Sequence, residues 1–284
     1  MAFLFYFDDM EFVIINGNIL EKSKAGLSAD DHSYRYGDGL FETMKIVKGN
    51  ILLEEYHFER LFSGLETLKF KTPAHFTKQK INEQVKELCK KNSNEESAKV
   101  RLSVSRGNGG LYDCDNKLSY LIEGWPLEQN HHVLNKNGLV IDVFPDAIKS
   151  IDKFANLKSA NYLPYVMAAI WAKENKLNDA LILNQHSRIC DATIANIFWI
   201  KNKKIFTPPL NEGCVAGVMR KKILELTIGD SDRLVQEHIL TEEILLQADE
   251  VFLTNATTGI RWVKECRGKI YKSTISSKIF STLG

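Results

Sequence analysis

The side chain best placed for covalent chemistry in this sequence is Lys158, within the segment FANLKSANYLP that runs from Phe154 to Pro164. An apolar, β-branched run from Gly138 to Phe144 precedes it and predicts a buried strand. Pro164 opens a run with helical spacing, so Lys158 stands just before a helix. The partial positive charge at a helix start favours the neutral amine, which is the form that makes a Schiff base. The alternative is an ordinary surface lysine, one of 37 basic residues.

Two arginines lie within predicted regular elements. Arg60 belongs to a predicted helix that follows Ile51 and runs to about Leu68. Arg101 shares one face of a predicted strand, Lys99–Ser105, with Ser103 and Ser105. A solvated surface charge is the alternative for each arginine.

Three further stretches carry polar groups beside predicted elements. Gly217 precedes a predicted helix, Val218–Leu226, whose first N–H groups would form an anion site. Asp191 stands before a predicted buried strand, Ile194–Ile200, where a plain turn aspartate is the alternative. A predicted strand from Val251 to Ile260 ends in small polar groups that include Asn255 and Thr257.

Hydrophobic periodicity predicts the elements that must position these side chains. An Asn-Gly turn predicts a hairpin within Phe12–Leu20. Gly37-Asp38-Gly39 requires an unusual backbone or a close approach of another group. Further strands are expected at 40–47, 118–123, 179–184 and 269–271, and further helices at 77–91, 241–249 and 273–283, with Thr241 as an N-cap and Gly229 as a C-cap.

Composition excludes several classes of protein. The chain has 284 residues, 44% of them hydrophobic, enough for one large or two medium domains. A formal net charge of +1 gives no field that attracts nucleic acid or an anionic membrane, and no apolar run approaches the roughly 20 residues that span a bilayer. The first twelve residues lack a basic region and a cleavage site, so we expect an edge strand or terminal extension rather than a signal peptide. Five scattered cysteines fit a reducing cytoplasm and argue against zinc and disulfides, and the adjacent His131 and His132 fit a linker better than a metal site.

The segment Lys158-Ser-Ala-Asn-Tyr-Leu163 resembles the lysine segment of the class IV aminotransferases, the fold-type IV pyridoxal-phosphate enzymes. This family comprises branched-chain aminotransferases, D-amino-acid aminotransferases and aminodeoxychorismate lyases. Tyr36–Thr43 (YGDGLFET) resembles the family's YGDGxFET element, and His57–Leu61 resembles its H-x-x-R-L. Before the first of these, Asp31-His32-Ser33 replaces the Asp-Arg-Gly common in relatives.

Further motifs follow in the family's order, and the resemblance covers about Phe12 to Tyr271. Arg106–Gly110 (RGNGG) resembles a turn of the lyases, although Leu111 stands where an arginine is usual. Asp191 begins a segment similar to E-x-x-x-x-N-[IV]-F, with aspartate in place of glutamate. Gly213–Arg220 resembles G-x-x-x-G-[IV]-x-R, and the run that begins with Asn255 resembles the lyases most.

The resemblance implies pyridoxal 5'-phosphate as the cofactor, no metal, and a small-molecule amino acid as the substrate. It implies that Lys158 forms the Schiff base and then moves the α-proton as general base and acid. It implies that Asp191 pairs with the pyridine nitrogen and that Tyr162 contacts the ring hydroxyl. The implied phosphate ligands are Arg60, the amides of Val218 and Met219, and Asn255 or Thr257; the implied substrate contacts are Tyr36, Phe41 and Arg101.

The implied fold is a two-domain α/β enzyme of fold type IV. We expect a small α/β domain over residues 1–123, a linker over 124–137, and a larger, mixed β-barrel-like domain over 138–284, with the cofactor between the domains. The family assembles as dimers, so a cytoplasmic homodimer is expected, with no nucleic-acid or membrane partner.

Two reactions divide the family, and the motifs point both ways. The stretches GDGLFETM, RGNGG and NATTGI favour aminodeoxychorismate lyase, which yields 4-aminobenzoate and pyruvate. Arg101 and the absence of an arginine at Leu111 favour an aminotransferase that uses branched-chain or D-amino acids and a 2-oxo acid acceptor. The preference here is for the lyase. A third hypothesis, supported only by Asp191, is a cofactor-binding protein that has lost efficient catalysis.

Overall fold

The computed structural model describes residues 11–127, 133–226 and 234–282. The chain forms two compact units, one made of Met1–His131 with Lys158–Asn161, the other of His132–Leu157 with Tyr162–Gly284. The predictions for most of the first twelve residues, for His131 and His132, and for Gly229 lie outside the described residues. No helix in the described ranges is both long and apolar enough to cross a membrane.

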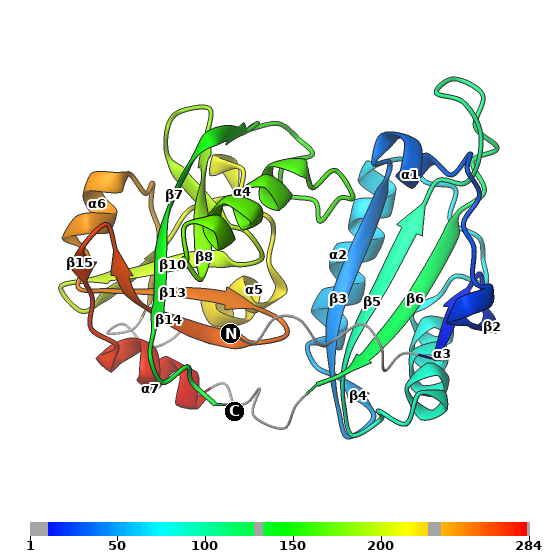
Figure 1. Ribbon diagram of the computed structural model, residues 1–284, viewed down its shortest axis with the longest axis horizontal. Helices are drawn as coiled ribbons and strands as arrows, with labels where there is room; N and C mark the ends of the chain where they lie inside the picture. The colour runs from blue at the N-terminus through cyan, green and yellow to red at the C-terminus, as the bar shows by residue number, and fades with distance from the viewer. Residues whose placement is uncertain (1–10, 128–132, 227–233, 283–284) are drawn as a thin grey trace. The chain divides into compact units, whose positions relative to one another are not determined.

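The first unit is a six-stranded sheet with the strand order β2-β1-β6-β5-β3-β4 and with helices α2 and α3 beside it (Figure 1). All of its strand pairs are antiparallel. Its strands are β1 (Phe12–Ile15), β2 (Asn18–Glu21), β3 (Gly39–Val47), β4 (Asn50–Ile51), β5 (Ser97–Ser105) and β6 (Ser119–Pro126), and its helices are η1 (Lys22–Lys24), α1 (His32–Tyr36), α2 (Glu54–Thr67) and α3 (Lys78–Lys91).

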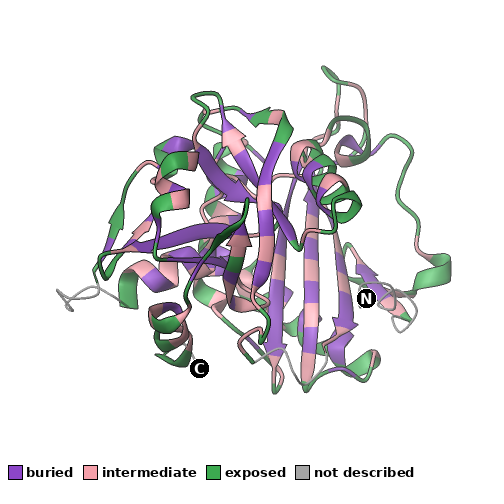
Figure 2. Ribbon diagram, turned by 60° about the vertical axis from the view of Figure 1, so that its left-hand side comes forward, coloured by how far each residue is buried: buried purple, intermediate pink, exposed green. Residues whose placement is uncertain are grey.

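The alternation of apolar and polar residues decides which face of this sheet is buried. Val100, Leu102 and Val104 of β5 are almost fully buried, whereas Lys99, Arg101 and Ser103 are half-buried. Figure 2 shows the same bands of buried and intermediate residues along the strands of this sheet. Because successive side chains of a strand point to opposite faces, Arg101 and its alternate neighbours lie on the face opposite the apolar core.

Glycines set the start of β3, as the sequence predicted. Gly37 adopts a left-handed conformation with φ of +67° and ends α1, a short helix that the sequence did not predict. A Cβ on Gly39 would lie 2.4 Å from the carbonyl oxygen of Val104. Only glycine allows β5 to approach this closely.

The second unit is a nine-stranded mixed sheet: eight strands follow the order β12-β11-β10-β13-β14-β7-β8-β9, and the ninth, β15, pairs with β14. Its strands are β7 (Leu139–Lys149), β8 (Asp179–Asn184), β9 (Ile189–Ala192), β10 (Asn196–Lys201), β11 (Lys204–Thr207), β12 (Val235–Glu237), β13 (Glu250–Asn255), β14 (Gly259–Cys266) and β15 (Lys269–Ile270). Its helices are α4 (Leu163–Glu174), η3 (Leu210–Glu212), α5 (Val218–Leu226), α6 (Glu242–Gln247) and α7 (Thr274–Thr282).

Three helices pack on parts of this sheet. Helix α4 packs on β7 and β8, while α5 and α7 pack on β13 (Figure 1). Phe198 and Phe252 stack with their ring centroids 5.0 Å apart and join Ile223 of α5 in one buried cluster. Helix α5 is therefore anchored on β10 and β13 through this cluster, and its first residues belong to the candidate site described below.

Two expectations for the second unit need correction, and one alternative is excluded. The predicted strand Val251–Ile260 is two strands, because Asn255 turns the chain and pairs with Gly259 across a hairpin. The alternative for Asp191, a plain turn aspartate, is excluded, because the residue lies in β9 and pairs with Ile182 of β8. Strand β10 begins at Asn196 rather than at Ile194. The polar residues expected to end a strand form a turn that is closed by their own side chains.

Candidate active site

The segment around Lys158 forms an extra edge on the sheet of the first unit. The Phe41 N–H donates to the Lys158 carbonyl at 2.9 Å, and the Ala160 N–H donates to the Gly39 carbonyl at 2.8 Å. Strand β4 pairs only with the far end of β3, so the first half of β3 has an open edge for this segment. The chemistry-bearing lysine is thus tied to the strand of the YGDGLFET motif.

The Phe41 ring lies next to two cations. The Lys158 Nζ is 4.4 Å from the ring centroid, and the Arg101 guanidinium carbon is 3.8 Å from it. Phe41 is only 5% exposed, and Arg101 Nε donates to Ser103 Oγ at 3.0 Å. Cation–π attraction holds the arginine and the amine near one ring. The structure therefore brings together Lys158, Phe41 and Arg101, which the sequence predicted separately.

Arg60 lies on the α2 side of the sheet, in a buried ionic group that the sequence did not predict. Its Nε and one terminal nitrogen donate to the two oxygens of Glu42 at 2.7 and 2.6 Å. His57 Nδ1 contacts Glu42 Oε2 at 2.6 Å. Burial acts to raise the pKa of Glu42, but the Arg60 charge and His57 outweigh it and hold the pKa at about 2. Glu42 thus fixes the orientation of the predicted phosphate-binding arginine.

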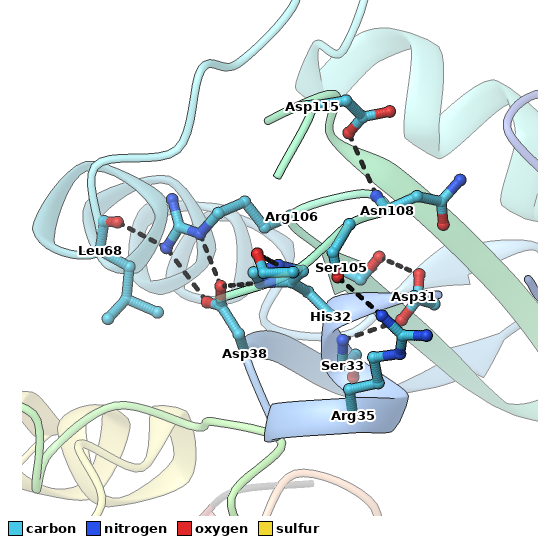
Figure 3. A network of polar contacts seen from close by, with 12 residues as sticks. Asp31, His32, Ser33, Arg35, Asp38, Leu68, Ser105, Arg106, Asn108 and Asp115 are labelled. Carbon is cyan, nitrogen blue, oxygen red and sulfur yellow. Dashed lines mark hydrogen bonds and ion pairs between the residues drawn. The ribbon is translucent and has the colours of Figure 1, made fainter. Parts of the chain in front are cut away.

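Tyr36 lies at the end of α1 and is 45% exposed. Its ring packs edge-to-face with the His32 ring, and the two ring centroids are 4.9 Å apart. His32 contacts Asp38 Oδ2 at 3.1 Å and the Gly110 carbonyl at 3.0 Å. Arg106 donates twice to Asp38, at 2.6 and 3.1 Å, and once to the Leu68 carbonyl (Figure 3). His32, which departs from the family's usual arginine, still joins the YGDG and RGNGG motifs through hydrogen bonds.

In the second unit, Asp191 is enclosed by four donors. Its Oδ2 accepts from Lys149 Nζ at 3.2 Å, Tyr165 Oη at 2.9 Å and the Val215 N–H at 2.8 Å. Its Oδ1 accepts from Asn196 Nδ2 at 2.9 Å. The residue is 1% exposed, and burial raises its pKa against the opposing effect of Lys149 and the other donors.

Tyr162 precedes α4 and stacks on Tyr165, with the ring centroids 4.3 Å apart. Its hydroxyl donates to the Thr193 carbonyl at 2.8 Å. A phenol has one proton to donate but can still accept through its oxygen. Tyr162 could therefore donate to a ring hydroxyl of a ligand only if the bond to Thr193 breaks.

The start of α5 leaves backbone donors available. The first α-helical bond runs from the Lys221 N–H to the Gly217 carbonyl, so the N–H groups of Val218 and Met219 precede the ladder. A Cβ on Gly217 would lie 1.8 Å from Asn196 Oδ1, so only glycine fits at this position. The helix of nine residues is long enough for these amides to present a useful positive field.

The hairpin turn between β13 and β14 is held by Asn255. Its Oδ1 accepts from the backbone N–H groups of Thr257 and Thr258 and from both of their hydroxyls, at 2.8 to 3.0 Å. The hydroxyl proton of Thr257 is therefore already in use. Asn255 Nδ2 makes no hydrogen bond within the described residues, which makes Asn255 the better donor of this pair toward an anion.

Sequence reasoning missed several residues of these groups. Glu42, Lys149 and Tyr165 carry no local signal, because an isolated charged or aromatic residue on a strand or helix has the pattern of an ordinary surface or core residue. Glu42 lies within the recognised YGDGLFET motif, and that position was the one available hint.

Comparison with known proteins agrees with the motifs. Residues 39–266 match the family model for amino-transferase class IV. The chain is 30% identical over 234 residues to the aminodeoxychorismate lyase of Vibrio harveyi, covering 81% of this chain and 83% of the relative. It is 26% identical over 256 residues to the D-alanine aminotransferase of Bacillus licheniformis, covering 87% of this chain and 86% of the relative.

Among solved structures, the chain is similar to the branched-chain aminotransferase of the thermophilic archaeon Thermoproteus uzoniensis, crystallised with norvaline. The TM-score is 0.83 at 22% identity, with 95% of this chain and 92% of the other covered, which establishes the shared fold. The family model spans most of the chain, and the lyase relative is matched over most of its own length. The chain belongs to the class IV aminotransferase family.

Proposed function

We propose that this protein is a pyridoxal-phosphate-dependent enzyme that acts on a small amine substrate, with Lys158 as its covalent anchor and proton carrier. The observation that carries the proposal is the fixed position of Lys158 on the β3 edge, beside Phe41 and Arg101. A lysine held by its backbone on a sheet edge can reach a ligand with little loss of conformational freedom.

The donors and acceptors of the chain fit this cofactor. The amides of Val218 and Met219, with Arg60 and Asn255, suit the phosphate, and Asp191 suits a protonated ring nitrogen. Tyr162 can accept from a ring hydroxyl while it keeps its bond to Thr193, and Thr257 contributes through the turn that it forms with Asn255. When bound, the cofactor supplies a ring that takes up the electron pair left by the departing α-proton.

Lys158 has two tasks in this proposal. Its Nζ binds the cofactor before the substrate arrives, and afterwards it removes and returns the substrate's proton. Tyr36, Phe41 and Arg101 are the substrate contacts that we propose. Arg101 presents a guanidinium that is able to bind a carboxylate with two parallel hydrogen bonds.

We favour the lyase reaction, which gives 4-aminobenzoate and pyruvate, because of the charges on the face of β3, β5 and β6 that carries Arg101. Lys45 and Lys99 are directly paired across the strands, and Arg101 pairs with Glu123. Burial lowers the pKa of Lys45 and of Lys99; at Lys99 the Arg101 charge lowers the pKa further, and Glu123 acts against both effects. An anionic substrate would offset the repulsion between Arg101 and Lys99. Both products of the lyase carry a carboxylate, so its substrate carries two.

The second candidate is transamination of a branched-chain or D-amino acid to a 2-oxo acid. It is favoured by Arg101 and by Leu111, which stands 62% exposed where the lyases carry an arginine. A cofactor-binding protein without efficient catalysis is the lesser alternative and predicts bound cofactor with no turnover.

We further propose a homodimer in the cytoplasm. Leu163, Val166, Met167 and Ile170 form a stripe at helical spacing on α4, and each is 44–65% exposed. An exposed apolar stripe of this kind is typical of a protein interface. Five free cysteines in the described residues fit a reducing compartment.

The test is the absorption spectrum of the protein loaded with pyridoxal phosphate. We expect an imine band in the natural protein and in Lys153→Ala, and none in Lys158→Ala. An imine band that persists in Lys158→Ala would remove Lys158 from the site. Adding L-glutamate, L-leucine or D-alanine should bleach the band to the pyridoxamine form if the protein is a transaminase. Release of pyruvate from aminodeoxychorismate without such bleaching would support the lyase.

A further inference from the structure

Lys149, at the end of β7, is a buried lysine whose ammonium meets Asp191. The side chain is 10% exposed, and its Nζ lies 3.2 Å from Asp191 Oδ2. The same Nζ lies 5.3 Å from the centre of the Tyr165 ring. Burying a lysine is unfavourable unless its charge is compensated, so this position depends on the carboxylate opposite.

The two oxygens of Asp191 are used unequally. Oδ2 accepts three bonds, from Lys149, Tyr165 and the Val215 N–H. Oδ1 accepts one, from Asn196, within the described residues. A carboxylate oxygen has two lone pairs, so Oδ2 is saturated while Oδ1 keeps one acceptor position. These four bonds fix the rotation of the carboxylate about its Cβ–Cγ bond. One further donor can then be accepted only by Oδ1.

The other titratable groups near Asp191 do not supply a charge. Burial raises the pKa of the Cys214 thiol to about 12, and burial also raises the pKa of Cys190 and of Tyr165. The Cys190 thiol donates a hydrogen bond to the Ile182 carbonyl, and the Tyr162 hydroxyl donates to the Thr193 carbonyl. Lys149 is therefore the cation in direct contact with this carboxylate among the described residues.

We propose that Lys149 is a positioning residue that keeps Asp191 ionised and turned so that Oδ1 is the oxygen that accepts from the cofactor's ring nitrogen. This rests on the proposed function. It offers a reason why the shorter aspartate serves in place of the family's usual glutamate: the side chain is held by four donors, and a charged partner offsets its burial.

The first measurement needs no cofactor. In the apoprotein, Lys149→Met should raise the pKa of Asp191 further. When the pKa of a carboxyl is higher in the folded than in the unfolded protein, the free energy of unfolding decreases as the pH rises through the folded-state pKa. In urea unfolding, the free energy of unfolding of Lys149→Met should therefore fall below that of the natural protein by an amount that grows from pH 5 to pH 8. This deficit should stay constant in the Asp191→Asn background, where no carboxyl titrates.

The second measurement reads the ring nitrogen directly, by ¹⁵N NMR of bound, ¹⁵N-labelled pyridoxal phosphate at pH 7. The natural protein, Lys149→Arg and the surface control Lys153→Met should all give the protonated shift. Lys149→Met should move the signal toward the unprotonated value, because Asp191 then takes up a proton itself. The affinity of Lys149→Met for pyridoxal phosphate should be about ten- to a hundred-fold lower than that of the natural protein. This is the loss in metal affinity found when a residue that hydrogen-bonds a metal ligand is mutated.

The outcomes separate this inference from the proposed function. If the natural protein binds no pyridoxal phosphate, the proposed function fails. If it binds the cofactor at Lys158 but Lys149→Met leaves the ¹⁵N shift and the pH-dependent deficit unchanged, the role of Lys149 is overturned. A Lys149→Arg variant that behaves like Lys149→Met would also overturn it, because a cation at this position should suffice.

Discussion

Phe41 and Lys158 are joined twice: the Phe41 N–H bonds the Lys158 carbonyl at 2.9 Å, and the Lys158 Nζ lies 4.4 Å from the Phe41 ring. The first contact ties the backbone of the lysine to β3, and the second restrains its side chain. These two residues, 117 positions apart in the chain, are thus held together by a backbone and a side-chain contact. The proton carrier that we propose Lys158 to be would need this fixed placement.

Ala160→Pro should detach this segment from the edge of β3. Proline removes the N–H that bonds the Gly39 carbonyl, and we expect a loss of about 1 to 2 kcal/mol. Hydrogen exchange should then show faster exchange of the Phe41 amide, while Ala160→Ser keeps it protected. Equal protection of Phe41 in both variants would show that the pairing does not hold the lysine.

Gly217→Ala should destabilise the second unit because the new Cβ would lie 1.8 Å from Asn196 Oδ1. The expected cost is about 1 to 3 kcal/mol, as for other forced insertions into a packed site. Gly26→Ala is the matched control, because a Cβ there meets nothing within 4 Å. Urea midpoints measure both, and a Gly217→Ala midpoint equal to that of the control would contradict the close approach.

Glu42 should make the first unit sensitive to acid. Its pKa is held at about 2 in the folded state against an ordinary value of 4.5, so the stability it contributes is present above pH 4.5 and is lost as pH falls toward 2. The difference corresponds to about 3 kcal/mol. Glu42→Gln should lose this part of the acid response in urea unfolding between pH 2 and 6. The control Glu87→Gln, at an exposed position, should keep this loss of stability at low pH. If Glu42→Gln loses as much stability as the natural protein when the pH falls, the low pKa of Glu42 is refuted.

Thr254 offers a stabilising substitution. Its hydroxyl is buried and has no hydrogen-bond partner within the described residues, and the residue is 2% exposed. Thr254→Val keeps the branched shape and removes the unsatisfied group, so the free energy of unfolding should rise by about 1 kcal/mol. A lower unfolding midpoint in Thr254→Val would mean that the hydroxyl has a partner in solution.

Met167→Lys should weaken the proposed homodimer by placing a charge in the apolar stripe of α4. Met167 is 44% exposed, so the substitution should leave the fold of the protomer intact. Sedimentation should show a shift toward monomer, whereas Glu174→Lys, at the end of the same helix, should stay dimeric. Dimers of undiminished stability in Met167→Lys would place the interface elsewhere.

The sequence by itself determined most of the elements and the residues that open them. Helices α2, α3 and α5 and the strands β3, β5 and β8 follow from periodicity, and Thr77 and Thr241 cap their helices through their own side chains. Lys158 and the start of α5 were predicted as site elements from local signals, a proline and a glycine at the start of a helix, and Arg60 from its resemblance to a family motif; their roles stay predictions. The short helix α1 and the β13–β14 turn were not predicted, because side-chain hydrogen bonds rather than hydrophobic periodicity define them.

Only the tertiary structure decided which partners these residues have. Glu42 with Arg60, Phe41 with Lys158, and Lys149 with Asp191 are pairs far apart in the chain, and strand register brings each together. A buried charge has the sequence pattern of a surface charge, because the residue type records neither its burial nor the counter-charge that makes the burial tolerable. Register and packing supply both, and with them the ionisation states on which the chemistry of this site depends.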